Sequence, residues 1–159
     1  MRRSLFGLIV AALWCATACF AQDAKSNGWP GTWKLDTAQS KIQQAPQQET
    51  LQVDAGTKVS IKWSLNGTDT DGATYHETFD GKADGNSYPI MRDQKEFAQI
   101  TYRWVNDNSV TALIRIPDGS ITSEKIDLAS DGKTMTVHLH SKSKEGKMLA
   151  DEVAVFRKQ

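Results

Sequence analysis

Cysteine is scarce in this sequence. The 159 residues include two cysteines, Cys15 and Cys19, and both lie in the first twenty positions. The chain after them therefore has no thiol with which to form a disulfide, bind zinc or act as a nucleophile. Its stability must come from a hydrophobic core, for which its length is sufficient.

The sequence also lacks an excess of charge of either sign. Lysine and arginine total 19, and aspartate and glutamate also total 19, which gives a formal net charge of zero. Without a basic excess, the chain has no electrostatic basis for binding nucleic acid. Its length and its 39% of hydrophobic residues indicate a single globular domain.

No hydrophobic run is long enough to cross a membrane as a helix. The run at 5–19 has 15 residues, whereas a spanning helix needs about 20. Two arginines precede this run, and small residues ending at Ala21 follow it, before a polar stretch. This order is typical of a cleaved secretory signal. We therefore expect a signal peptide at 1–21, a flexible polar leader at 22–28, a domain at 29–159, and export to the periplasm or the extracellular space.

A lipid anchor is a second interpretation of the same segment. Ala16-Thr17-Ala18-Cys19 resembles a bacterial lipoprotein box, in which the cysteine is lipidated after cleavage. Ala16 stands where that box usually has a large aliphatic residue, so simple export is favoured. A lipid on Cys19 would instead tether the protein to the envelope.

From Trp29 onward, apolar and polar residues alternate with the period of a β-strand. The clearest example is 58–65, where Val59, Ile61, Trp63 and Leu65 share one face. Similar segments occur at 32–35, 49–54, 73–80, 88–90, 97–104, 109–116, 121–128, 133–141 and 148–158. The sequence therefore predicts about ten short strands, and the irregular stretch 36–48 has room for one short helix.

Turn residues separate these segments. The pairs are Asn66-Gly67, Asp71-Gly72, Asp80-Gly81, Asp84-Gly85, Asp118-Gly119 and Asp131-Gly132. Such pairs adopt the backbone angles of tight antiparallel turns. Because no long amphipathic helix separates the strands, parallel βαβ units are excluded. We predict an all-β fold, a single antiparallel up-and-down β-barrel of about 8–10 strands, which leaves no exposed edge.

Gly31-Thr32-Trp33 opens the first segment and resembles the lipocalin signature. The wider pattern, including Ser130-Asp131-Gly132-Lys133 and the Tyr88-Pro89 pair, is similar to secreted bacterial lipocalin-like proteins of the calycin type. This resemblance implies that Trp33, beside Gly31, plugs one end of the barrel. It also implies that a late arginine, Arg157, packs over Trp33 in a cation–π contact.

Intracellular fatty-acid-binding proteins also have about ten strands, but their signature differs. Their last strand carries an inward Arg-x-Tyr pair that grips a carboxylate. The corresponding residues here are Ala154-Val155-Phe156, so the sequence does not predict a carboxylate clamp of that kind.

His138 and His140 are two residues apart on one predicted strand, so they share a face and could supply two zinc ligands. Met135, Val137 and Leu139 claim the opposite face for the core, so we expect both histidines to face solvent. They are weak metal candidates, and we predict no metal site and no cofactor. No nucleophile, phosphate-binding or dinucleotide-binding motif occurs, so we predict that the protein is not an enzyme.

The candidate ligand-binding residues lie on predicted inward faces. They are Trp63, Tyr75, Glu77, Phe79, Tyr102 and Trp104. The aromatic residues can either line a ligand pocket or fill a small barrel with side chains. Glu77 can anchor a ligand from an apolar interior or lie in water near the barrel mouth. The sequence leaves both questions open.

The function predicted on these grounds is a secreted, non-enzymatic, lipocalin-like barrel that binds a small apolar or amphipathic molecule. The alternative is a filled barrel that serves as an interaction module in the envelope or outside the cell. No nucleic-acid partner is predicted, and no motif identifies a protein partner.

Overall fold

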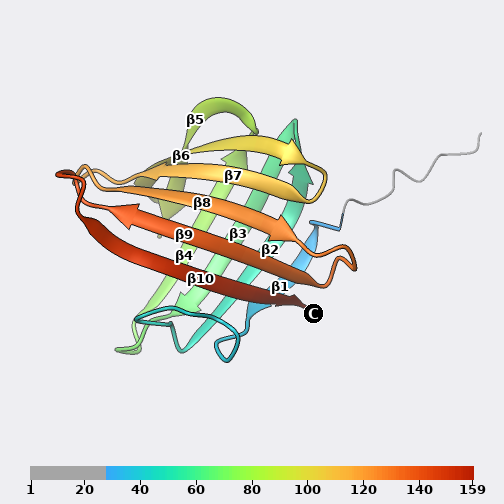
Figure 1. Ribbon diagram of the computed structural model, residues 1–159, viewed down its shortest axis with the longest axis horizontal. Coiled ribbons are helices and arrows are strands. Elements are labelled where there is room, and N and C mark those ends of the chain that lie inside the picture. The colour runs from blue at the N-terminus through green and yellow to red at the C-terminus, as the bar shows by residue number, and fades with distance from the viewer. Residues whose placement is uncertain (1–27) are drawn as a thin grey trace, which may run out of the picture.

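The computed structural model describes residues 28–159. The predicted signal peptide, most of the leader and Cys19 therefore lie outside the described residues. The described chain forms ten strands (Figure 1). They are β1 (Gly31–Leu35), β2 (Gln48–Thr57), β3 (Ser60–Thr68), β4 (Thr74–Gly81), β5 (Asp84–Arg92), β6 (Lys95–Asn106), β7 (Ser109–Arg115), β8 (Ile121–Leu128), β9 (Thr134–Lys142) and β10 (Met148–Lys158).

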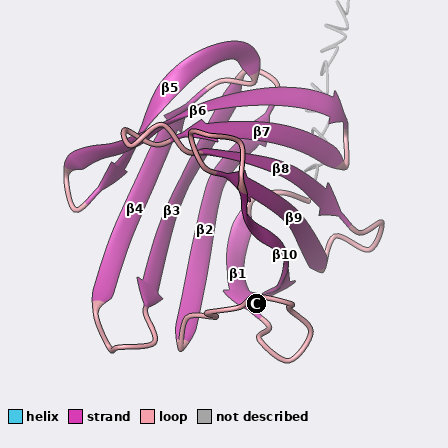
Figure 2. Ribbon diagram, turned by 60° about the vertical axis from the view of Figure 1, so that its left-hand side comes forward, coloured by secondary structure: helices cyan, strands magenta, loops and turns pink. Residues whose placement is uncertain are grey.

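Each strand pairs antiparallel with the next along the chain, and β10 pairs with β1 to close the barrel (Figure 2). The predicted fold class, a single antiparallel up-and-down barrel, is thus confirmed. Residues 28–159 contain strands and turns throughout. Within this range there is accordingly no helix long and apolar enough to cross a bilayer.

The core lies on the inner face of the barrel, where alternate side chains point inward. On β6, Ala98, Ile100 and Tyr102 are at most 5% exposed, and Arg103 between Tyr102 and Trp104 is exposed. Period-two patterning thus predicted the buried face of this strand correctly.

Three of the predicted turn pairs lie in strands. Asn66-Gly67 is inside β3, Asp80-Gly81 ends β4, and Asp84-Gly85 begins β5. The turn between β5 and β6 is instead made by Asp93 and Gln94, whose φ angles are 49° and 67°. These two residues adopt the left-handed conformation that glycine usually supplies, so a search for glycine could not find this turn.

The last strand turns the even-numbered side chains near its end toward the interior. Ala154 and Phe156 line the interior. Val155, on the outer face, is also buried because the irregular segment 36–42 packs over it. Asp36 N–H donates to the Val155 carbonyl at 2.8 Å. The short helix that this stretch had room for does not form, because turns occupy it.

Candidate functional site

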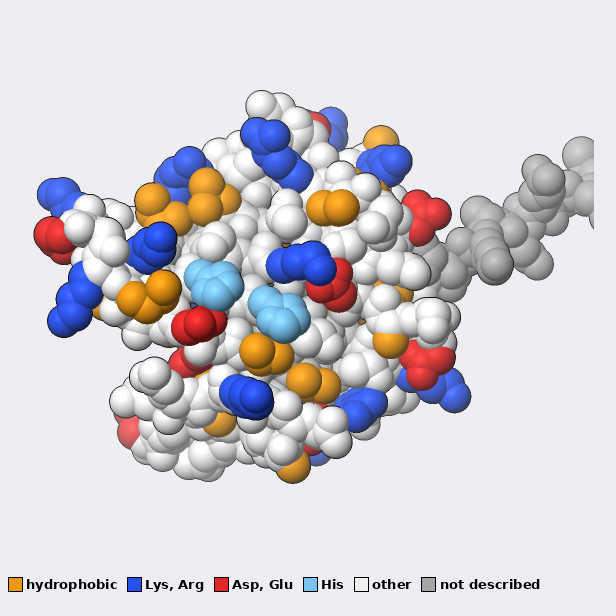
Figure 3. Space-filling view, viewed as in Figure 1, with side chains coloured by type: hydrophobic (Ala, Val, Ile, Leu, Met, Phe, Trp, Pro, Cys, Tyr) orange, Lys and Arg blue, Asp and Glu red, His pale blue; other side chains and the backbone are white. Residues whose placement is uncertain are grey.

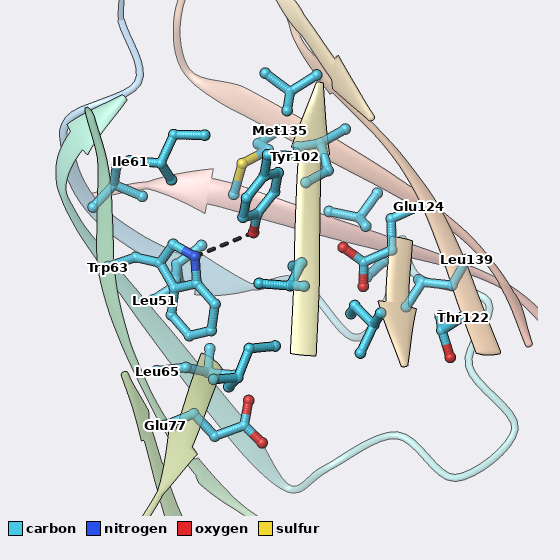
Figure 4. A pocket seen from close by; sticks show the side chains of 18 of the residues that line it. Leu51, Ile61, Trp63, Leu65, Glu77, Tyr102, Thr122, Glu124, Met135 and Leu139 are labelled. Atoms are coloured by element: carbon cyan, nitrogen blue, oxygen red, sulfur yellow. Dashed lines mark hydrogen bonds between the residues drawn. The ribbon is translucent and has the colours of Figure 1, made fainter. Parts of the chain in front are cut away.

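The barrel encloses a cavity of about 470 Å³. Its wall is mainly aliphatic and aromatic, and the aliphatic part includes Leu51, Ile61, Leu65, Ile100, Ile114, Ile126, Met135, Val137 and Leu139 (Figure 4). The side chains of ten strands therefore do not fill this barrel, and the interior keeps space for a small molecule.

Five of the six predicted ligand-binding residues line this cavity: Trp63, Tyr75, Glu77, Tyr102 and Trp104. Phe79 is 2% exposed and lies outside the lining. It packs behind Trp63 and Tyr102, at ring-centre distances of 5.8 and 5.2 Å. Phe79 thus supports the aromatic wall without forming part of its surface.

The indole of Trp63 and the phenol of Tyr102 are joined across the barrel. Trp63 Nε1 donates a hydrogen bond to the Tyr102 hydroxyl at 3.2 Å (Figure 4). Tyr102 is 5% exposed, and its burial strongly raises the pKa of its hydroxyl. This hydrogen bond fixes the orientation of two large rings, so the wall of the cavity is preorganised.

Glu77 is neither a lone carboxylate in an apolar interior nor a wet group at the mouth. It is 8% exposed and forms an ion pair with Arg92, whose Nε donates to Glu77 Oε1 at 2.8 Å. The two residues face each other across β4 and β5. Arg92 also lies over the Phe97 ring, with its guanidinium carbon 3.6 Å from the ring centre. The pair thus satisfies a charge that would be costly to bury alone.

The Tyr75 side chain passes over Gly67 to reach Glu49. Glu49, Gly67 and Tyr75 are cross-strand neighbours on β2, β3 and β4. A Cβ on Gly67 would lie 2.1 Å from the Tyr75 ring, so only glycine leaves room for this ring. The Tyr75 hydroxyl donates to Glu49 Oε2 at 2.5 Å. Gly67, predicted as a turn residue, therefore positions a site residue.

The pKa of the Glu49 carboxyl is raised because the group is buried. The hydrogen bond from Tyr75 opposes this increase, and the nearby charges of Glu77 and Asp69 add to it. Burial, followed by the bond to Glu49, also raises the pKa of Tyr75. Because the pKa of Tyr75 is raised, its phenol keeps the proton and donates a hydrogen bond to the Glu49 carboxylate.

Glu124 is the most deeply placed of the acidic cavity residues that sequence patterning missed. It projects from β8 into the cavity (Figure 4), and no hydrogen bond or ion pair joins its side chain to another residue in the 28–159 range. Burial, followed by the charges of Glu77 and Glu49, raises its pKa to about 7. Ile121 and Ile126 lie on opposite faces of β8, so the alternation was ambiguous. Its register opposite Ala112, an inward residue, is the signal that could have found it.

The end of the barrel beside Gly28 and Trp29 is closed by Trp33, which is fully buried and donates through Nε1 to the Trp29 carbonyl at 3.0 Å. The prediction that Arg157 packs over Trp33 is wrong. Lys158 lies directly opposite Trp33 on β10, with its ammonium 5.0 Å from the ring centre.

Arg157 is one residue out of phase, so it points outward to Asp36 and Thr134, with distances of 3.4 Å and 2.6 Å. Gly31 lies at the closed end as predicted. A Cβ on this residue would meet the Lys158 side chain at 2.6 Å, and its φ of 138° favours glycine.

His138 and His140 lie on the outer face of β9, and both are exposed. Two histidine side chains are visible side by side among charged groups on this face (Figure 3). His140 Nδ1 lies 3.0 Å from Asp151 Oδ1. In the part of the chain that the structure describes, no three histidine, cysteine, aspartate or glutamate residues lie together as a metal site would require.

Comparisons with known proteins define the class of fold. No protein-family model matches the chain, and no curated protein matches it. A mutant of the fluorescent protein UnaG is similar, with a TM-score of 0.56 and 11% identity over 83% of this chain and 96% of that chain. A redesigned β-barrel is similar, with a TM-score of 0.50 and 12% identity over 84% of this chain and 94% of that chain. At such identities the likeness shows the fold alone, a closed calycin-like barrel.

Proposed function

We propose that the protein is an exported, non-enzymatic barrel that binds a small apolar or amphipathic molecule in its interior. The observation that carries this proposal is the cavity of about 470 Å³ inside the closed barrel. Binding sites for small molecules commonly measure about 300–1,000 Å³ and combine apolar walls with a few placed polar groups. The filled-barrel alternative requires side chains to occupy this space.

Export is proposed from the sequence of residues 1–21, which places the mature protein in the periplasm or outside the cell. The mass of the intact mature protein tests this. A chain that begins at Gln22 supports simple export, a lipid on Cys19 supports the anchored form, and an uncleaved Met1 end contradicts both.

The binding function is tested with Nile red, a neutral dye that fluoresces in apolar surroundings. We expect saturable binding at one site per chain. Ile114 lines the cavity, and Leu113 is its neighbour on the opposite face of β7. Ile114→Trp is therefore expected to weaken binding by about tenfold or more, because it occupies cavity volume, while Leu113→Trp leaves binding unchanged.

Thermal melts of both variants show whether the barrel remains folded. Equal binding by the wild type and a folded Ile114→Trp variant would place the dye on the outer surface and contradict the proposal.

A further inference from the structure

The charged residues around the cavity are predominantly acidic. Four carboxylates line it, from Glu49, Asp69, Glu77 and Glu124, and a single base, Arg92, faces them. A low-dielectric interior strengthens the field of these groups. The balance of charge thus opposes an anionic ligand and favours a cationic one.

The single base is already occupied. Arg92 is bonded to Glu77 and stacked on Phe97. An anionic ligand would have to displace Glu77 and would leave a buried carboxylate without a partner, at a large cost in free energy. Arg92 therefore serves Glu77 and is not a free anchor for a ligand carboxylate.

Two of the carboxylates also have partners within the protein. Glu77 has Arg92, and Glu49 accepts the Tyr75 hydroxyl at 2.5 Å. Glu124 has neither a donor nor a cation in the described chain, and its carboxyl group points from β8 toward the centre of the cavity (Figure 4). Asp69, the fourth carboxylate, is exposed to solvent. Glu124 is therefore the acidic group inside the cavity whose partner a ligand can supply.

Aromatic groups on the facing wall suit a cation as well. The Trp63 and Tyr102 rings line the cavity, and the electron-rich faces of such rings attract organic cations. The Tyr102 hydroxyl accepts one hydrogen bond, from Trp63. Its oxygen has a second lone pair, which can accept from an N–H group of a ligand.

We propose that the ligand is an organic cation, an apolar molecule that carries a protonated amine, and that the Glu124 carboxylate binds this amine. The inference rests on the binding function proposed above and adds the charge of the ligand to it. The apolar body of the molecule occupies the aliphatic part of the cavity, and its ammonium group donates to Glu124.

Calorimetric titration of the purified protein with octylamine, octanol and octanoate tests this proposal, because the three probes share one apolar chain. At pH 8 we expect octylamine to bind about tenfold or more tightly than octanol, and octanoate to bind most weakly. Glu124→Gln is expected to abolish the advantage of the amine and to improve octanoate binding. Glu145→Gln, on the exposed β9–β10 turn, is the matched control and should change neither value.

The pH dependence of octylamine affinity provides a second measurement. If the role of Glu124 were only structural, this affinity would not change with pH. The charged groups that line the cavity with it are Glu49 from β2, Asp69 after β3, Glu77 from β4 and Arg92 from β5, together with the Tyr102 phenol from β6. With a pKa of about 7, Glu124 is mostly protonated at pH 6 and mostly ionised at pH 8. Octylamine affinity should therefore rise by about tenfold over this range, while octanol affinity stays constant.

The outcomes separate the two proposals. If octanol or Nile red binds in the cavity but octylamine has no advantage, or if Glu124→Gln leaves that advantage intact, the inference about charge is overturned and the binding function stands. If none of the four molecules binds, both proposals fail.

Discussion

Gly67 was predicted to form a turn, but in the structure it lies under the Tyr75 ring and makes room for it. The Tyr75 side chain lies over its Cα and reaches Glu49 on the far strand. We expect Gly67→Ala to destabilise the protein by about 2–3 kcal/mol, because the new methyl group would overlap the ring and displace it. Urea unfolding followed by tryptophan fluorescence measures this change.

Tyr75→Phe is the matched control for that substitution. It removes the hydroxyl and keeps the ring, so it should cost only about 1–2 kcal/mol through the lost bond to Glu49. If Gly67→Ala costs no more than Tyr75→Phe, then the close approach of the ring over Gly67 does not matter for stability.

Glu124 gives the protein a characteristic dependence on pH. Its pKa is about 7 in the fold, above its ordinary value of 4.5 in the unfolded chain, so the folded state binds the proton more tightly. Its contribution to stability is therefore complete below about pH 4.5 and is lost as the pH rises to about 7. For Glu124→Gln, we expect a gain of about 2–3 kcal/mol at pH 8 and almost none at pH 4.5.

Unfolding free energies of both proteins at pH 4.5, 6, 7 and 8 measure this difference. Parallel curves for the wild type and the variant would show that the carboxyl group does not titrate abnormally in the cavity.

Lys158, and not Arg157, holds the closed end. Its ammonium donates to the Gly28 carbonyl at 2.7 Å and lies over Trp33. Lys158→Ala should therefore cost about 1–2 kcal/mol. Arg157→Ala removes exposed contacts only and should cost about 0.5 kcal/mol. Thermal melts of the two variants rank them, and a larger loss for Arg157→Ala would restore the original prediction.

At the level of strands, the sequence predicted all ten elements, and it predicted the inward face for about half of them. Period-two patterning succeeds where one face is uniformly apolar, as on β6. It fails on β8, where Ile121 and Ile126 lie on opposite faces. The inward orientation of Glu124 was therefore not predicted. It could not place Arg157 and Lys158 either, because the register of β10 against β1 comes from closing the barrel and not from a local pattern.

The charge pairs of the site were also beyond local reasoning. Glu77 and Arg92 are 15 positions apart in sequence, and they meet because the β4–β5 ladder aligns them. To predict this pair, one must know the register between β4 and β5. The predicted strand at 88–90 was also too short to include Arg92. The aromatic wall was predictable, whereas the partners of its acidic groups were not.

The ladder between β4 and β5 has the fewest register pairs in the barrel. Its register consists of two residue pairs, Glu77 with Arg92 and Thr78 with Met91, whereas pairing between β3 and β4 extends from Ile61 to Thr68. Fewer shared hydrogen bonds lower the free energy of local opening. We expect backbone amides of 79–81 and 84–88 that face this ladder to exchange with deuterium faster than those between β3 and β4.

Hydrogen exchange measured by mass spectrometry on overlapping peptides makes this comparison. Equal protection of the two ladders would mean that the β4–β5 ladder is held by side chains, such as the Glu77–Arg92 pair, as firmly as by the backbone. Arg92→Met separates these contributions, since it removes the ion pair and keeps the apolar stem.

For the whole molecule, the central claim is that a closed barrel keeps an interior for a small molecule. Ten strands enclose more volume than their inward side chains occupy, even with Trp63, Tyr102 and Trp104 in the wall. The Glu124 carboxyl, which has no partner in the described chain, is explained if a bound molecule completes the interior.

Native mass spectrometry tests this claim most directly, on protein purified without detergent from the cells that make it. We expect a mass above that of the polypeptide by one small molecule per chain. This extra mass should be lost on denaturation and absent from the Ile114→Trp variant. A native mass equal to that of the bare polypeptide would contradict it.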